Sequence, residues 1–199
     1  VEAAALPLAG LTALRLLGAV GAVVGRRLLL TGASGGVGHY CTELAAAAGA
    51  EVTAVTATPE RGRRLLELGA AAVVHDVAAA AGPFDVVLES TGGPALPAAL
   101  AKLVPGGLLV WFGQASRTPV TLDFFDLLSG PERATIQHFH YAAAPYGPDL
   151  ATLVRLVAAG RLHPEIGRVT DWADTASTLV DLRERRIRGR AVLTVGGAR

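Results

Sequence analysis

The 199-residue sequence predicts an α/β domain in which helices cover both faces of a doubly wound parallel sheet. Short apolar runs of strand length alternate with helical patterns through residues 27–141. The runs are apolar at nearly every position, which indicates strands that are buried on both faces. A glycine-rich turn joins the first run to the helix after it. We expect six strands in the spatial order 3-2-1-4-5-6, followed by a C-terminal helix–strand extension.

The individual elements have recognisable boundaries. The opening "AAALPLAGLTALRLLGAVG" is apolar on every side, which predicts one largely buried helix. Further along, Gly49 and Gly69 end two predicted helices, and Thr58 with Pro59 begins the second of them. The predicted strands occupy residues 27–32, 52–57, 71–75, 84–90, 106–113 and 133–141, and the helices between them roughly residues 37–48, 59–69 and 95–103.

Only nine residues, "HDVAAAAGP", join the third strand to the fourth. In the predicted order this link crosses back past the first strand, so it must be largely extended. We therefore expect no more than a helical turn or two there. Beyond residue 148, the pattern predicts two more helices, a crossing loop and a final strand, which is more than a six-stranded sheet requires.

Composition limits the classes of protein that fit. The net charge of +1 favours neither nucleic acid nor an anionic membrane as partner. Cys41 is the only cysteine, so neither an intramolecular disulfide nor a cysteine-based zinc site can form. No apolar run is long enough to span a bilayer and no signal peptide precedes the fold, so we expect a cytoplasmic protein with a small-molecule substrate. The sequence contains no methionine, so Val1 is not expected to be the natural start.

The stretch "LLLTGASGGVGHY", residues 28–40, has the features of a phosphate cradle. The start of a helix offers unpaired backbone N–H groups and the positive end of the helix dipole. Gly35, Gly36 and Gly38 leave room for a pyrophosphate to approach the backbone, and Ala33 stands where the strict dinucleotide fingerprint has its first glycine. The alternative is a plain strand-to-helix turn. The sequence does not favour a P-loop, because no Gly-Lys-Ser/Thr follows the turn.

The end of the second strand separates NADPH from NADH. Sites specific for NADH place a carboxylate there for the ribose 2′-hydroxyl, whereas this strand ends at Thr56, and Arg61 follows within reach. A guanidinium pairs well with a 2′-phosphate, so the sequence favours NADPH. The alternative for Arg61 is a solvated helix residue. Glu60 is interpreted as a first-turn carboxylate that complements the helix dipole.

Small polar residues follow the fourth and fifth strands in "ESTGG" (89–93) and "FGQAS" (112–116). Ligands of this fold lie outside the carboxyl ends of the strands, so these loops suit close contact with a nicotinamide and its ribose. Ordinary loop chemistry is the alternative for each. The basic cluster "RERRIRGR" (183–190) is interpreted as a solvated face near a helix end.

Together these motifs resemble the medium-chain dehydrogenase/reductase superfamily, and within it the zinc-free branch of quinone oxidoreductases and enoyl reductases. "AAALPLAGLTAL" resembles the helix that leads into the cofactor domain of that family, and "GASGGVG" its variant of the nucleotide loop. "FDVVLESTGG", "LVPGGLLVWFGQAS" and "ADTASTLVDLRERRIRGRAVLTV" follow in the order of the family. The resemblance covers nearly the whole chain.

The resemblance implies a Rossmann domain over residues 1–165, including its lead-in helix, and a segment over 166–199 that returns toward a GroES-like catalytic domain absent from this sequence. Some relatives place a tyrosine after the third strand, where this chain has His75 and Asp76. No catalytic residue and no metal ligand is assigned. The cofactor contacts implied are Thr12 at the nicotinamide, Ser34, Gly35, Gly36, Val37 and Gly38 at the pyrophosphate turn, Thr56 and Arg61 at the adenosine ribose, and Ser90, Thr91, Phe112 and Gly113 at the nicotinamide ribose and ring.

The activity implied is zinc-independent hydride transfer from NADPH to a quinone or an α,β-unsaturated carbonyl. In this superfamily the sixth strand often pairs with its twin, so we expect a homodimer through residues 133–141. Three alternatives stay open: the cofactor domain of a zinc-dependent alcohol dehydrogenase, an enoyl reductase module of a polyketide synthase, and a non-catalytic nucleotide-binding module.

Overall fold

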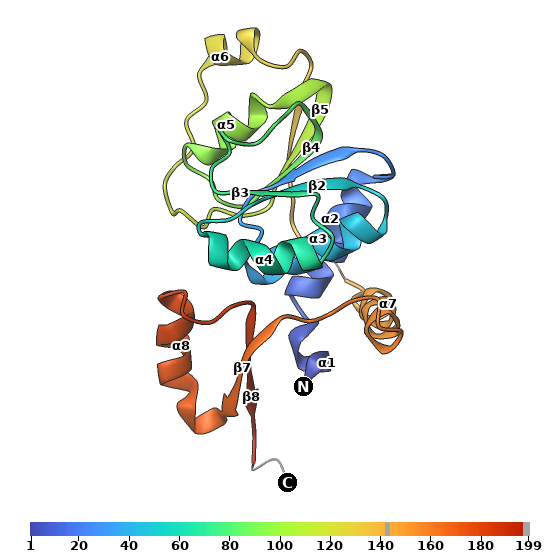
Figure 1. Ribbon diagram of the computed structural model, residues 1–199, viewed down its shortest axis with the longest axis vertical. Helices are drawn as coiled ribbons and strands as arrows, with labels where there is room; N and C mark the ends of the chain where they lie inside the picture. The colour runs from blue at the N-terminus through green and yellow to red at the C-terminus, as the bar shows by residue number, and fades with distance from the viewer. Residues whose placement is uncertain (142–143, 197–199) are drawn as a thin grey trace.

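A computed structural model describes residues 1–141 and 144–196 of the chain. It contains a six-stranded parallel sheet flanked by helices and, below it in Figure 1, a small C-terminal unit of residues 166–196. The sheet has the order β3-β2-β1-β4-β5-β6, which confirms the predicted topology. Its strands are β1 (Arg27–Leu30), β2 (Glu51–Val55), β3 (Ala72–Val74), β4 (Phe84–Glu89), β5 (Leu103–Trp111) and β6 (Thr135–His138).

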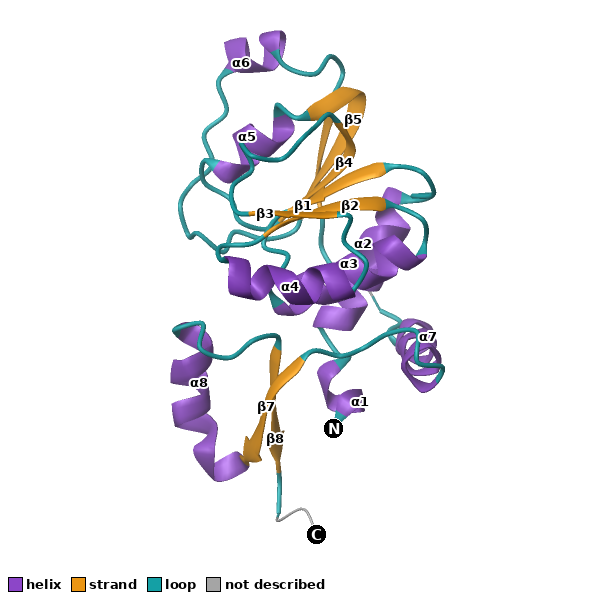
Figure 2. Ribbon diagram, in the orientation of Figure 1, coloured by secondary structure: helices purple, strands orange, loops and turns teal. Residues whose placement is uncertain are grey.

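The sheet is covered on both faces, as Figure 2 shows. Its strand residues alternate between two cores: Leu28 and Leu30 of β1 face one, Leu29 faces the other, and all three are fully buried. This explains why the strands are apolar at every position rather than at every second one. The first core includes residues of α2 (Ala9–Val20), α3 (Gly36–Ala47), α4 (Pro59–Glu67) and α7 (Gly147–Ala158), and the second residues of α5 (Ala95–Leu100).

The opening helix differs from the prediction, because it consists of two helices rather than one. α1 (Glu2–Ala5) is followed by a break, and α2 begins at Ala9. Pro7 has no N–H and therefore cannot donate the hydrogen bond that would continue α1. Leu8 adopts a left-handed φ of 61°, which turns the chain before α2 begins. The pattern of apolar residues continues across the break and therefore gave no sign of it.

Several other boundaries differ in detail. β5 begins at Leu103 rather than 106 and α5 ends at Leu100, while β6 is shorter than the predicted 133–141. The short helix α6 (Phe124–Ser129) was not predicted. The nine-residue link from β3 to β4 contains only turns, as expected from its length. In the described part of the chain, no helix has the length and apolarity that crossing a membrane requires.

The C-terminal unit corrects the predicted crossing loop, part of which is a strand. β7 (Ile166–Asp171) pairs in parallel with β8 (Arg190–Thr194). A 3₁₀ turn, η1 (Trp172–Asp174), and α8 (Thr175–Arg183) connect the two strands. β7 alternates between exposed and half-buried residues and includes Gly167, so its sequence lacks the apolar run that marks the strands of the main sheet.

Gly38 provides the contact that brings α3 close to the end of β1. A Cβ at residue 38 would lie 2.3 Å from the carbonyl oxygen of Ala33, which is backbone and cannot move aside. Gly38→Ala is therefore expected to lower the free energy of unfolding by about 2 kcal/mol, measured by urea denaturation. Gly18→Ala is the control, because a Cβ at Gly18 meets nothing within 4 Å. It should raise stability by about 0.5–1 kcal/mol, and equal effects of the two changes would contradict the packing argument.

Candidate functional site

A cavity of about 1220 Å³ lies at the carboxyl edge of the parallel sheet. Its walls come from the ends of β1, β2, β4 and β5, the first turn of α3, residues at the start of α2 and the C-terminal unit. The cavity collects every site residue predicted from the sequence, although these residues span a hundred positions. They are Thr12, Ser34, Gly35, Gly36, Val37, Gly38, Thr56, Arg61, Ser90, Thr91, Phe112 and Gly113.

The glycine turn leaves the start of α3 open toward the cavity. Gly35 is the N-cap in an extended conformation, and no side chain caps the helix there. The first-turn amides are therefore free to bind an anion, with the positive end of the dipole behind them. Gly32 makes the turn itself, with a left-handed φ of 61°, and a Cβ there would lie 2.5 Å from the Ser90 hydroxyl. The sequence analysis did not assign Gly32, although "TGASGG" contains it.

Thr56 and Ser34 form one wall of the cavity together. The Thr56 hydroxyl donates a 2.8 Å hydrogen bond to the Ser34 hydroxyl, and Thr56 is buried. This contact ties the end of β2 to the glycine turn. Arg61, one turn into α4, donates to the backbone carbonyl of Arg185 in the C-terminal unit. Arg61 therefore lies at the boundary between the two parts of the molecule.

Glu89 organises the loop after β4, a role that the sequence analysis missed. Its side chain is fully buried at the end of the strand. One carboxylate oxygen accepts hydrogen bonds from the Thr31 hydroxyl at 3.0 Å and from the Thr91 and Gly92 amides at 2.8 and 3.1 Å. Burial raises the pKa of Glu89, and these donors oppose the shift. A carboxylate directly after the apolar run 86–88 was the available signal.

Arg190 is a third residue at the site that was not predicted from the sequence. A Cβ built at Gly36 would lie 3.1 Å from Arg190 Cδ and 3.3 Å from Nη1. Another guanidinium nitrogen, Nη2, donates to the carbonyl of Pro7 at 3.0 Å. A fixed positive charge thus lies beside the first turn of α3. The cluster of residues 183–190, interpreted as a solvated face, therefore includes a residue at the glycine turn.

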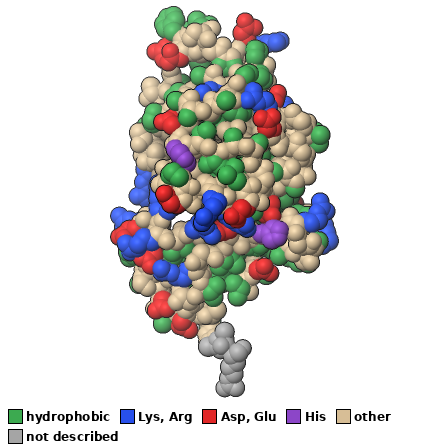
Figure 3. All heavy atoms as spheres, viewed as in Figure 1, with side chains coloured by type: hydrophobic (Ala, Val, Ile, Leu, Met, Phe, Trp, Pro, Cys, Tyr) green, Lys and Arg blue, Asp and Glu red, His purple; other side chains and the backbone are tan. Residues whose placement is uncertain are grey.

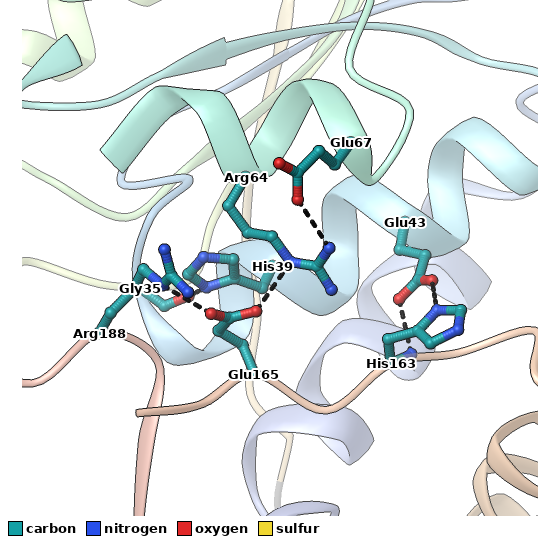
Figure 4. A network of polar contacts seen from close by, with 8 residues as sticks. All are labelled: Gly35, His39, Glu43, Arg64, Glu67, His163, Glu165 and Arg188. Atoms are coloured by element: carbon teal, nitrogen blue, oxygen red, sulfur yellow. Dashed lines mark hydrogen bonds and ion pairs between the residues drawn. The ribbon is translucent and has the colours of Figure 1, made fainter. Parts of the chain in front are cut away.

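An ion-pair network joins the C-terminal unit to the helices behind the glycine turn (Figure 4). Glu165 accepts a hydrogen bond from Arg64 Nε of α4 at 2.8 Å, and its other oxygen forms an ion pair with Arg188 Nε at 2.6 Å. Burial alone would raise the pKa of Glu165, but the Arg64 hydrogen bond and the Arg188 charge outweigh it and hold the pKa below its ordinary value. Figure 3 shows acidic and basic side chains gathered across the middle of this face.

His39 of α3 lies beside this network without a hydrogen bond or ion pair to it in the described residues. Its Nδ1 donates to the Gly35 carbonyl at 2.9 Å, and its Nε2 is buried without a hydrogen-bond partner in the described residues. Burial lowers the pKa of His39 below its ordinary value, so the ring is held neutral at pH 7. Beside it, His163 Nδ1 lies 2.5 Å from a Glu43 oxygen, a further link between α3 and the chain that follows α7.

These features define the class of the protein. A doubly wound parallel sheet with an uncapped, glycine-lined helix start at its carboxyl edge is a dinucleotide-binding α/β domain. Residues 36–159 match the family described as zinc-binding dehydrogenase, and the chain belongs to this family within the medium-chain dehydrogenase/reductase superfamily. Among residues 1–141 and 144–196, no group of three or more His, Cys, Asp or Glu side chains could hold a metal ion.

Individual relatives agree with the family. The mitochondrial NAD(P)H oxidoreductase RTN4IP1 of Bos taurus is 29% identical over 225 residues, which cover 98% of this chain and 55% of that protein. The spectinabilin polyketide synthase system protein NorB of Streptomyces orinoci is 33% identical over 215 residues, 98% of this chain and 9% of that protein. A mycobacterial protein solved in complex with NADPH superposes with a TM-score of 0.81 at 25% identity, covering 96% of this chain and 64% of that chain.

The chain spans about half the length of the RTN4IP1 proteins that it matches.

Glu165→Gln tests the network that anchors the C-terminal unit. At pH 7 the variant should lose about 2 kcal/mol of unfolding free energy, because Arg64 and Arg188 lose their common partner. The native pKa of Glu165 lies below its unfolded value, so the contribution of the carboxylate is complete above about pH 5 and is lost as the pH falls through the native pKa. Urea denaturation from pH 7 to 3 should show the difference between wild type and variant shrinking in acid.

Glu67→Gln is the matched control, because Glu67 pairs with the same Arg64 at 3.0 Å but is 55% exposed. This change should cost no more than about 0.5 kcal/mol. A Glu165→Gln difference that stays constant down to pH 3 would show that the charge of Glu165 is not what stabilises the contact.

Proposed function

We propose that this chain is the NADPH-binding domain of a zinc-independent oxidoreductase that transfers hydride to a quinone or an α,β-unsaturated carbonyl. The observation that carries the proposal is the cavity of about 1220 Å³ at the open start of α3. It exceeds the ordinary range for drug-sized ligands, as an extended dinucleotide requires. Family membership and the relative solved with NADPH support the same reading.

The glycine turn fits a pyrophosphate. The amides at Gly36, Val37 and Gly38 would bind its oxygens, and Arg190 beside Gly36 would add a fixed positive charge. Two sources of positive potential at one place favour a ligand group with two negative charges. Because Gly35, Gly36 and Gly38 have no side chains, the space beside these amides stays open for the ligand.

The loops after β4 and β5 fit the nicotinamide end. A bound nicotinamide cofactor would supply the hydride, and the protein would orient it. Glu89 holds the Ser90–Gly92 backbone, so this wall is set before any ligand binds. A Cβ at Gly113 would lie 3.1 Å from the Ser90 carbonyl oxygen, so the two loops pack tightly together. This part of the chain therefore contributes shape and positioning, and no residue in it is assigned to proton transfer.

We also propose that residues 1–165 form the cofactor domain and that residues 166–199 return toward a further domain. The C-terminal unit exposes apolar side chains on β7, η1 and α8. Val169, Trp172 and Leu179 are 50, 59 and 60% exposed. A two-stranded sheet is marginal alone, so this surface suits a covering partner that completes the substrate site.

A polyketide synthase enoyl reductase module is the second candidate, favoured by the 33% identity to NorB. The two candidates share the cofactor and differ in the acceptor. If the protein encoded by the complete reading frame reduces an enoyl thioester but not a soluble quinone, the result would favour the module.

Titration of the 199-residue chain with NADPH and NADH tests the cofactor proposal. The expected result is binding of NADPH at least tenfold tighter than NADH, because Arg61 meets the 2′-phosphate and no carboxylate stands at Thr56. Fluorescence of the bound reduced nicotinamide measures both constants. Equal or tighter binding of NADH would overturn the preference, and binding of neither would overturn the cofactor domain.

A homodimer through β6 is proposed on the exposure of that strand. All four of its residues are exposed, and β6 ends the order of the sheet, with β5 as its only neighbouring strand in the described part of the chain. Ile136→Lys should convert a dimer to a monomer, because the apolar side chain is replaced by a charge at the paired edge. Light scattering after gel filtration measures the mass. Val24→Lys, at a site 78% exposed, should leave the dimer intact. A wild-type monomer at all concentrations would contradict the proposal.

A further inference from the structure

Arg15 of α2 joins this helix to the segment between β6 and α7. Its guanidinium donates from Nε to the Asp149 carboxylate at 2.7 Å, from Nη1 to the Tyr141 carbonyl at 2.6 Å and from Nη2 to the Pro145 carbonyl at 2.8 Å. The same group lies over the Tyr146 ring, 5.1 Å from its centre. One side chain therefore contacts this segment from its beginning to the first turn of α7.

The chemistry of arginine explains why it stands at this position. A planar guanidinium holds its donors in fixed directions, so it can bind several acceptors that do not contact one another. Two of the acceptors are backbone carbonyls, and a contact to the backbone fixes the path of the chain rather than one side chain. The Arg15 side chain is 17% exposed, so these contacts are partly shielded from water.

The helices α2 and α7 also contact each other apart from Arg15. Leu153 of α7 is fully buried, and a Cβ built at Gly10 would lie 3.1 Å from its Cδ1. This apolar contact lies more than one helical turn before Arg15 on α2. The contacts of Arg15 with carbonyl groups therefore bear mainly on the segment between β6 and α7, and less on the packing of the two helices.

Both sides of the Arg15 contact border the cavity. Thr12, three residues before Arg15 on α2, is buried and lines the cavity. Tyr141, whose carbonyl accepts from Arg15, lines it as well. β6 lies beside β5 in the sheet, and Phe112, directly after β5, belongs to the same part of the wall. This is the end of the cavity to which the proposed binding mode brings the nicotinamide.

We infer that Arg15 is a positioning residue for the nicotinamide end of the cavity and acts through Tyr141. The inference rests on the proposed function, because it requires a nicotinamide dinucleotide in the cavity. A wall that is already in place spares the ligand the free-energy cost of ordering it. Arg15 holds the wall after β6 in this way, as Glu89 holds the wall after β4.

Arg15→Met tests this role, because methionine keeps an apolar stem and has no donors. The Kd for NADPH should rise about tenfold, and the Kd for 2′-phospho-ADP-ribose, which lacks only the nicotinamide, should change less than twofold. Titration calorimetry on the 199-residue chain measures both constants. NADH and ADP-ribose repeat the comparison without the 2′-phosphate, so the result does not depend on which dinucleotide is preferred.

Arg155→Met is the matched control. Arg155 is an exposed arginine of α7 that donates to the Thr152 hydroxyl of its own helix and does not line the cavity. This change should leave every constant within twofold of wild type. A loss of NADPH affinity equal to that of Arg15→Met would show that any arginine of this region has the effect, which overturns the inference.

Arg15→Lys separates positioning from stability. Lysine restores the charge beside Asp149, but its single ammonium cannot bind all the acceptors of the guanidinium. The thermal midpoint, which Arg15→Met should lower by no more than about 4 °C, should recover in Arg15→Lys. The affinity for NADPH should recover less than the midpoint does. Full recovery of both would assign the effect to charge alone and overturn the inference.

A double-mutant cycle tests whether Arg15 acts through Tyr141. Tyr141→Ala keeps the carbonyl that Arg15 contacts and removes the side chain from the cavity wall. In the Tyr141→Ala background, Arg15→Met should raise the Kd for NADPH less than threefold, because the side chain that it positions is gone. A further tenfold increase in that background would contradict the coupling.

The possible failures are distinguishable. If wild type binds no dinucleotide, the proposed function falls together with this inference. If Arg15→Met weakens NADPH and 2′-phospho-ADP-ribose equally, Arg15 contributes to stability without positioning the nicotinamide end, and only the inference is overturned. If wild type binds these two ligands equally well, the nicotinamide end adds nothing to binding, which again overturns the inference alone.

Discussion

The close contact between Gly38 and the Ala33 carbonyl determines where the functional edge of this molecule lies. No side chain could fit between them, so α3 starts directly above the end of β1. The amides of its first turn therefore point into the cavity at the carboxyl edge of the sheet. The walls supplied by β2, β4 and β5 matter for binding because they surround this one helix start.

The C-terminal unit depends on the same helix start for its position. The segment between α7 and β7 passes behind the glycine turn, and its Glu165 lies between Arg64 and Arg188. Partly buried ion pairs add little net stability compared with apolar packing, but removing one member leaves the others without partners. They therefore suit a contact that must form in one arrangement only. That arrangement brings the Arg190 guanidinium beside Gly36 and the Arg185 backbone carbonyl to Arg61, so one charge from the end of the chain lies at the glycine turn.

The sequence could predict those parts of the molecule that are determined locally. Strand patterns, helix caps and the glycine turn depend on neighbouring residues, so the strands and the doubly wound fold could be predicted. The twelve cavity residues were predicted with the help of the resemblance to the superfamily. Glu89 was missed because its partners, Thr31 and two amides, come together only once β1 and β4 pair. Arg190 was missed because more than 150 positions separate it from Gly36. The strand β7 was missed because a half-exposed pair of strands in a small unit has no continuous apolar run.

The departure of Ala33 from the dinucleotide fingerprint also has a physical explanation. The first glycine of that fingerprint serves a tight turn, and in this chain Gly32 has the left-handed φ that the turn requires. Ala33 is not among the described residues with positive φ, so a side chain is tolerated there. Its methyl group is fully buried in the core beneath α3, and its amide donates to Val55 O at 3.0 Å, which joins the turn to β2. The motif thus has glycine at residue 32, where the backbone requires a left-handed φ, and a side chain that packs into the core at residue 33.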